Sequence, residues 1–120
     1  RNDSITLLVF DDTIPENQHK KSLQIGRIFT EFPSEKIQIR YVAERGASEQ
    51  MRMLDERVKV SELSHDLFST SRNCIFLLKE SDNTVIIDSR KRIRGQYNLN
   101  DMEDADRLVM QELNILFKRY

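Results

Sequence analysis

The sequence predicts an α/β fold in which helices flank a central mixed β-sheet. Three observations support this prediction. Short apolar runs alternate with an amphipathic stretch in the first half, two close apolar runs are separated by a turn in the second half, and an amphipathic segment ends the chain. The first pattern is typical of parallel strands and the second of antiparallel strands. At 120 residues the chain has the length of one domain, predicted to span residues 1–120.

The first half predicts a strand, a helix and a second strand. Residues Ile5–Phe10 are almost wholly apolar, as in a strand covered on both faces. A helix is predicted to start near Pro15 and to end before Pro33, because apolar residues recur there every three or four positions: Ile25, Ile28, Phe29 and Phe32. Residues Ile37–Ala43 alternate apolar with polar side chains, which predicts the parallel partner strand of a right-handed βαβ unit.

The middle of the chain predicts a second helix. Gly46 breaks the preceding strand and Ser48 is a suitable cap, with an apolar stripe at Met51, Leu54 and Val58. Residues 60–68 are predicted to add one further short helical turn.

The second half predicts an antiparallel hairpin followed by a helix. The apolar runs Cys74–Leu78 and Thr84–Ile87 are separated by the turn-forming residues 81–83, and Ile93–Tyr97 is expected to pair next. Asn100 and Glu103 resemble a capping box for a last helix. Its apolar face is predicted at Met102, Ala105, Val109, Leu113 and Leu116. The resulting order, β-α-β-α-β-β-α, is that of thioredoxin-like domains.

One stretch resembles a known family more specifically. Residues 85–97 read Val-Ile-Ile-Asp-Ser-Arg-Lys-Arg-Ile-Arg-Gly-Gln-Tyr, and an acidic segment with Asp106-Arg107-Leu108 follows. This pattern resembles the C-terminal part of the Sco/SenC family, thioredoxin-like copper proteins of cytochrome oxidase assembly. Residues 7–12 and the helix ending at Phe32 resemble the family's upstream strand and helix. The resemblance implies a thioredoxin-like domain located outside the cytoplasm, with a role in oxidase assembly.

The sequence departs from that family in two places. Lys91 stands where the family commonly has glycine in the turn. The family binds copper through a Cys-x-x-x-Cys loop between the first strand and first helix, together with a distant histidine, whereas residues 11–20 contain no cysteine. Cu(I) prefers thiolate ligands, and disulfide exchange needs two thiols. We therefore do not expect the family's copper or redox activity here, and no cofactor is predicted.

The one cysteine, Cys74, excludes a disulfide or a cysteine pair within the chain. It lies in an apolar run and free cysteines are usually buried, so we favour a packing role in the core. The alternative is a reactive thiol, which requires exposure and a lowered pKa.

The loop after the first predicted strand holds the other candidate residues. Asp11, Asp12 and His19 are suitable ligands for a hard or borderline divalent metal. Aspartates after a strand more often form turns or cap a helix, and we favour that interpretation. Together with the chain before Cys74, this loop is the predicted contact surface for another protein.

Charge argues against nucleic acid as a ligand, because 19 basic and 20 acidic residues give a net charge of −1. Residues 90–94 form a local basic cluster, which suits an acidic partner, an anionic lipid or, as we favour, a solvated turn. No apolar run approaches the ~20 residues of a membrane span, so membrane attachment is expected only through a segment outside this chain.

Together these observations predict a non-catalytic, extracytoplasmic thioredoxin-like module that binds or scaffolds another protein. One alternative is a divergent thiol oxidoreductase or metal-handling protein that uses Cys74 or the Asp11, Asp12 and His19 loop. Another is an oxidase-assembly factor that binds its partner without carrying copper. The sequence leaves the oligomeric state open.

Overall fold

The computed structural model describes residues 4–32, 36–46, 55–79, 81–113 and 116. Its centre is a five-stranded sheet in the order β3-β2-β1-β4-β5. Strands β1, β2 and β3 are parallel, whereas β4 is antiparallel to β1 and β5 is antiparallel to β4. The strands are β1 (Ile5–Phe10), β2 (Ile37–Glu44), β3 (Lys59–Leu63), β4 (Thr84–Ile87) and β5 (Ile93–Tyr97). The predicted mixed sheet, with a parallel and an antiparallel half, is confirmed.

The first βαβ unit forms as predicted. Helix α1 (Pro15–Glu31) ends before Pro33 and connects β1 to β2, which pair in register from Ile5 opposite Ile37 to Phe10 opposite Val42. Proline at the first helical position suits the start of α1, since its missing N–H would have no partner in the helix.

The region after β2 differs from the prediction. Residues 60–68 were expected to form a helical turn, but Lys59–Leu63 form β3 at the sheet edge, and helix α2 (His65–Thr70) follows. The Ser64 side chain accepts a hydrogen bond from the Leu67 amide and so caps α2. Most of the helix predicted from Ser48 falls on residues 47–54, outside the described residues. Val58, at its predicted end, is buried.

The prediction of a strand over residues 74–78 is wrong. Residues Ser71–Ile75 instead form a π-helical turn, η2, that extends α2. The predicted hairpin with residues 84–87 is therefore absent, because β4 lies between β1 and β5 and has no free edge for a third strand. A short apolar run fits a strand or a helix, and here tertiary pairing decided between them.

The last helix forms as α3 (Met102–Asp106) and continues through a π-helical segment, η3 (Arg107–Glu112). The predicted capping box is wrong, since Asp101 is the N-cap residue and makes no side-chain cap. Instead, the Asp104 carboxylate accepts the Asn98 amide at 2.7 Å. Met102 is 61% exposed and so lies off the predicted apolar face, whose other members are buried: Ala105, Val109, Leu113 and Leu116.

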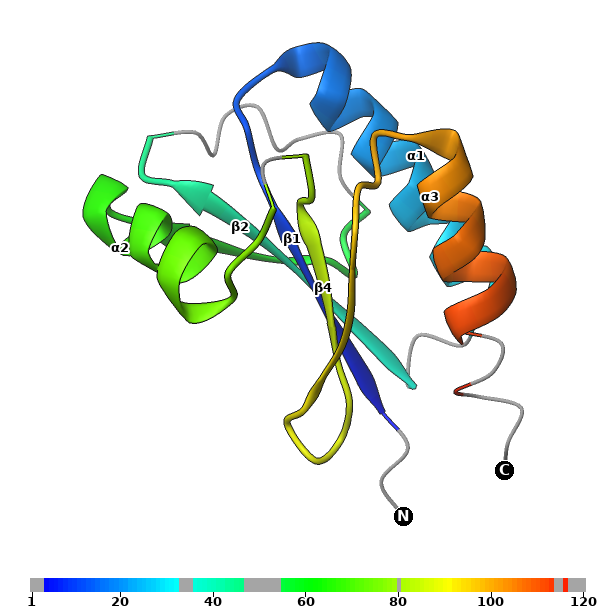
Figure 1. Cartoon of the computed structure of the whole chain (residues 1–120). Helices are drawn as coiled ribbons and strands as arrows, with labels where there is room; N and C mark the ends of the chain where they lie inside the picture. Colours follow the sequence, from blue (N-terminus) through cyan, green and yellow to red (C-terminus); the bar gives the residue numbers. More distant parts are fainter. Residues whose placement is uncertain (1–3, 33–35, 47–54, 80, 114–115, 117–120) are drawn as a thin grey trace.

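Helices cover both faces of the sheet. Figure 1 shows α1 and α3 side by side on one face and α2 on the other. Alternate residues of β1 point to opposite faces, so Leu7 and Val9 join the core beneath α1 and α3, whereas Phe10 packs with Phe68 and Val85 beneath α2. This arrangement places the loop between β1 and α1 at one end of the sheet, beside the start of β4.

Candidate functional site

Asp11 is the centre of a buried hydrogen-bond network at the end of β1. Its Oδ1 accepts the Gln18 side-chain amide at 2.7 Å and the Tyr41 hydroxyl at 2.8 Å, while Oδ2 accepts the Thr13 amide at 3.0 Å. The residue is only 4% exposed. Both carboxylate oxygens are thus occupied by donors of the protein itself, as a buried polar group requires.

Tyr41 reaches this network from β2. Burial raises the pKa of its hydroxyl, and the hydrogen bond to Asp11 raises the pKa further. The hydroxyl therefore stays protonated at neutral pH and acts as a donor toward the Asp11 carboxylate.

Asp12 is partly exposed and holds the start of α1. Its carboxylate accepts the Ile14 amide at 3.0 Å and the Asn17 side-chain amide at 2.7 Å, and lies 3.5 Å from the Lys21 Nζ. Partial burial raises the pKa of Asp12, but these hydrogen bonds and the lysine charge outweigh it, so the pKa is lowered overall. Asp12 is therefore an ionised residue of the turn before α1, as the turn interpretation predicted. It does not cap the helix, because the N-cap residue is Ile14 and has no side-chain cap.

Lys21 is fully buried on the inner side of α1. Its Nζ has no hydrogen-bond partner among the described residues, although Asp12 lies at ion-pair distance. Burial lowers the pKa of Lys21, against the opposing effect of Asp12 and Asp11, and the positive charge of Arg72 lowers it further. A lysine ammonium in this position is costly, since an ion pair rarely recovers all the hydration energy that burial removes.

The third predicted loop residue does not join the two aspartates. His19 is exposed on α1. Within the described part of the chain, no group of three His, Cys, Asp or Glu side chains is placed to hold a metal ion. The described structure therefore does not bring Asp11, Asp12 and His19 together as ligands of a metal ion.

The prediction of a core role for Cys74 is wrong, because the residue is exposed. The physical reason is the π-helical turn at residues 71–75, which replaces a strand that would have been covered on both faces. Of the predicted apolar run, only Leu78 is buried, against Phe10 and Phe68.

Exposed apolar side chains border the loop. Ile14, which precedes α1, is 49% exposed, and Ile75 and Leu77, which precede β4, are 61% and 71% exposed. The two segments lie at the same end of the sheet, since the Phe10 amide at the end of β1 donates to the Asn83 carbonyl at the start of β4. Leu77 has a φ of 50°, an unusual backbone conformation for a bulky residue.

Sequence reasoning missed several residues of this end of the molecule. Gln18 and Lys21 continue the three- and four-residue spacing of the apolar face of α1 toward its start, which was a usable signal for burial. Tyr41 likewise alternates with Ile37 and Ile39. Asn83 gave no such signal, yet it is buried, accepts the Leu99 amide and donates to the Asn98 side chain.

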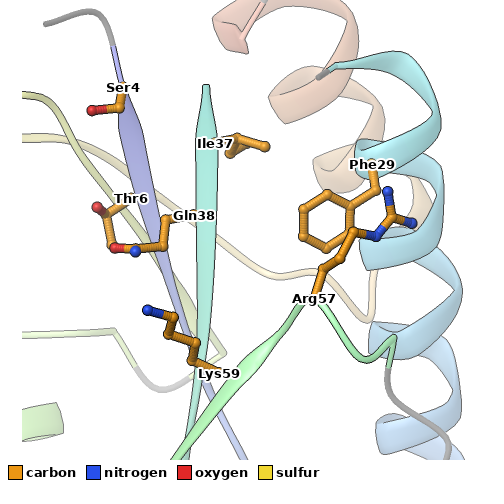
Figure 2. Close-up of a pocket in the computed structure, with 7 residues that line it drawn as sticks. All are labelled: Ser4, Thr6, Phe29, Ile37, Gln38, Arg57 and Lys59. Atoms are coloured by element: carbon orange, nitrogen blue, oxygen red, sulfur yellow. The ribbon is translucent and has the colours of Figure 1, made fainter. Parts of the chain in front are cut away.

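A pocket of about 400 Å³ lies at the opposite end of the sheet. Figure 2 shows Arg57 lying against the Phe29 ring, with Thr6, Gln38 and Lys59 beside the strands. The Arg57 guanidinium is 4.4 Å from the ring centre and forms an ion pair with Asp55 at 2.6 Å. None of the residues predicted as site residues lines this pocket: its lining is Ser4, Thr6, Phe29, Ile37, Gln38, Arg57 and Lys59.

Comparison with solved structures decides the fold. A copper-bound ScoI from Arabidopsis thaliana superposes with a TM-score of 0.62 and 13% identity, over 99% of this chain and 87% of that one. A putative protein disulfide isomerase from Bacteroides thetaiotaomicron gives the same TM-score and identity, over 96% and 75%. Apo Sco1 from Thermus thermophilus gives a TM-score of 0.57 and 16% identity, over 97% and 81%.

The fold is thioredoxin-like. Both the predicted fold class and the likeness to Sco proteins at the level of fold are thereby confirmed. No family model matches the sequence, and no curated protein matches it. Among the described residues, no helix is long and apolar enough to cross a membrane.

Proposed function

We propose that this chain is a non-catalytic thioredoxin-like module that binds another protein through the end of the sheet where β1 meets α1. The observation that carries the proposal is the closed network around Asp11. Both Asp11 oxygens and both Asp12 oxygens are engaged by groups of the chain itself. These hydrogen bonds give both carboxylates a structural role in the loop.

The apolar residues around the loop support a protein partner. Ile14, Ile75 and Leu77 are largely exposed, whereas most apolar side chains of this size in the described chain are buried. Exposed apolar side chains beside a polar loop match the apolar centre and polar rim of protein interfaces. The partner-binding surface is therefore assigned to Ile14, Ile75 and Leu77 together with Asp12.

A location outside the cytoplasm and a role in oxidase assembly are part of the proposal. The support is the Sco/SenC-like pattern of residues 85–97 and the fold shared with two Sco structures. Fold alone does not carry function, so a test of this proposal must address the site itself.

A photo-reactive amino acid placed at Ile14 or at Leu77 tests the partner surface in intact cells. Both positions should cross-link to the same protein. Leu23 is the matched control, because it is 60% exposed but lies on the outer side of α1. Ile14→Asp should then weaken recovery of that protein, while Leu23→Asp should not. Equal cross-linking from Leu23 would refute this surface.

The exposure of Cys74 favours a second candidate, a protein that uses a single reactive thiol or handles a metal. A Cu(I) competition titration of the reduced protein, repeated with Cys74→Ser, separates the two. Absence of competition supports the binding module. Tight one-to-one binding that Cys74→Ser abolishes would support metal handling instead. Rapid alkylation of the native thiol at neutral pH would likewise favour the reactive thiol.

A further inference from the structure

The turn between β4 and β5 is the most basic short segment among the described residues. Arg90, Lys91, Arg92 and Arg94 lie within five residues, and all four are exposed. Figure 1 shows this hairpin projecting from the sheet at the end that holds the start of β1, away from the loop between β1 and α1. The group is separate from the partner-binding surface proposed above.

One carboxylate offsets part of this charge. Asp88 lies 3.3 Å from the Arg92 Nε and 3.8 Å from an Arg94 guanidinium nitrogen, and accepts the Arg90 and Arg92 amides. No described residue forms an ion pair with Arg90 or Lys91. The tip of the hairpin, residues 88–94, thus has a net charge of about +3, whereas the whole chain has a net charge of −1.

The backbone of the turn gives an independent reason to regard the charge as functional. The Lys91 amide donates to the Asp88 carbonyl and the Asp88 amide donates to the Arg92 carbonyl, both at 3.0 Å, while Lys91 has a φ of 68°. This is a hairpin turn whose left-handed position favours glycine. A lysine there costs stability and adds a charge at the outermost point of the turn.

An apolar side chain lies within the same basic segment. Ile93 is 48% exposed and stands between Arg92 and Arg94. Basic side chains flanking an exposed apolar one are suited to a bilayer surface, where the cations meet phosphate groups and the apolar side chain reaches the acyl boundary. The tip is convex, and the pocket at this end of the sheet is lined by other residues, so a flat anionic surface fits it better than an acidic peptide would.

We propose that the β4–β5 hairpin docks on a bilayer containing anionic phospholipid, through Arg90, Lys91 and Ile93. Each unit of net positive charge near such a surface strengthens binding about fivefold, so the net charge of about +3 on this segment should strengthen binding about 100-fold over a neutral bilayer. Docking in this way leaves the loop between β1 and α1 directed away from the membrane, where a protein partner can reach it.

Vesicle co-sedimentation of the purified chain tests this proposal. The protein should sediment with phosphatidylcholine vesicles that contain phosphatidylserine, should stay in solution with phosphatidylcholine alone, and should be released by high salt. The double variant Arg90→Glu, Lys91→Glu should reduce the bound fraction at least about 10-fold, because it reverses the charge of the tip. Ile93→Thr, which keeps a β-branched side chain, should reduce binding several-fold.

The matched control is Arg45→Glu with Lys79→Glu, which makes the same change in net charge at exposed positions on the other end of the sheet. This variant should bind anionic vesicles like the wild type, and circular dichroism should show that all variants are folded. Equal loss of binding in both double variants would overturn the proposal, as would absence of sedimentation with anionic vesicles. Binding to soluble polyglutamate in place of vesicles would overturn it in favour of an acidic protein partner.

Discussion

At the scale of single residues, the buried polar groups near the end of β1 differ in whether their hydrogen bonds are satisfied. Asp11, Tyr41 and Gln18 satisfy one another, whereas the Lys21 ammonium is buried without a hydrogen-bond partner among the described residues. A satisfied group stabilises the fold and an unsatisfied one destabilises it. The two kinds of residue should therefore respond in opposite ways to apolar replacement.

Tyr41→Phe removes the hydroxyl that donates to Asp11 and leaves the ring in place. Because Asp11 is buried, losing this donor should lower the free energy of unfolding by about 2 kcal/mol, measured by urea denaturation at neutral pH. Asn17→Ala, which removes a donor to the partly exposed Asp12, provides the comparison and should cost less. An unchanged midpoint in Tyr41→Phe would show that the hydrogen bond adds nothing to stability.

Lys21→Met should leave the protein at least as stable at pH 7, because it removes a buried charge while keeping an unbranched apolar side chain. The lowered pKa of Lys21 adds a pH dependence. Below the folded-state pKa the full cost of the buried charge is present, and wild-type stability recovers as the pH rises from that pKa toward 10.5. The difference between Lys21→Met and wild type should therefore shrink as the pH rises through this range. Lower stability of the variant at pH 7 would mean that the ion pair with Asp12 outweighs the cost of burial.

At the scale of elements, turn chemistry and strand pairing explain where the chain departs from its local patterns. The β4–β5 turn keeps its hydrogen bonds although Lys91 is in the left-handed region, and Asp88 holds the turn by accepting two amides. The Arg92 amide lowers the pKa of Asp88, and the other donors of the turn act in the same direction. The Asp88 carboxylate thus stabilises the turn, although Lys91 occupies the left-handed position that favours glycine.

Lys91→Gly should raise the free energy of unfolding by about 1 kcal/mol, because glycine adopts this backbone conformation without steric cost. Thermal unfolding followed by circular dichroism measures the effect. Lys91→Ala is the control, since it removes the same charge but keeps the Cβ atom, and it should not stabilise the protein. If both variants were equally stabilised, the gain would come from charge removal and not from the backbone.

At the scale of the whole molecule, apolar packing and not surface charge holds the last helix to the sheet. Leu108 is fully buried in the core beneath α1 and α3. Arg27 on α1 also forms an ion pair with Asp106 on α3 at 2.7 Å, but Asp106 is exposed and Arg27 is partly exposed. Exposed pairs of this kind add little to stability, whereas a buried leucine adds much.

Leu108→Ala should therefore lower the free energy of unfolding by about 3 kcal/mol, and Arg27→Ala by less than about 1 kcal/mol. Urea denaturation at low and high salt measures both, and only the Arg27→Ala effect should diminish with salt. A larger loss from Arg27→Ala than from Leu108→Ala would contradict this account of how α3 is held.

The sequence by itself determined the first βαβ unit, the mixed sheet and the apolar side of the last helix, because each rests on a periodicity that local sequence carries. It also showed that the paired cysteines of the Sco-like resemblance are missing. It located Asp11 and Asp12 in the loop after the first strand, but not the Tyr41, Gln18 and Lys21 side chains that reach them from other positions.

Tertiary structure alone decided the rest. The apolar run from Cys74 to Leu78 fits a strand as well as a helical turn, and it became helical because β1 and β5 occupy both edges of β4. That choice exposed Cys74, Ile75 and Leu77 and brought them to the end of the sheet that holds Asp11. Strand order depends on contacts between residues far apart in the chain, so no local pattern could specify which side chains would be buried and which left at the surface.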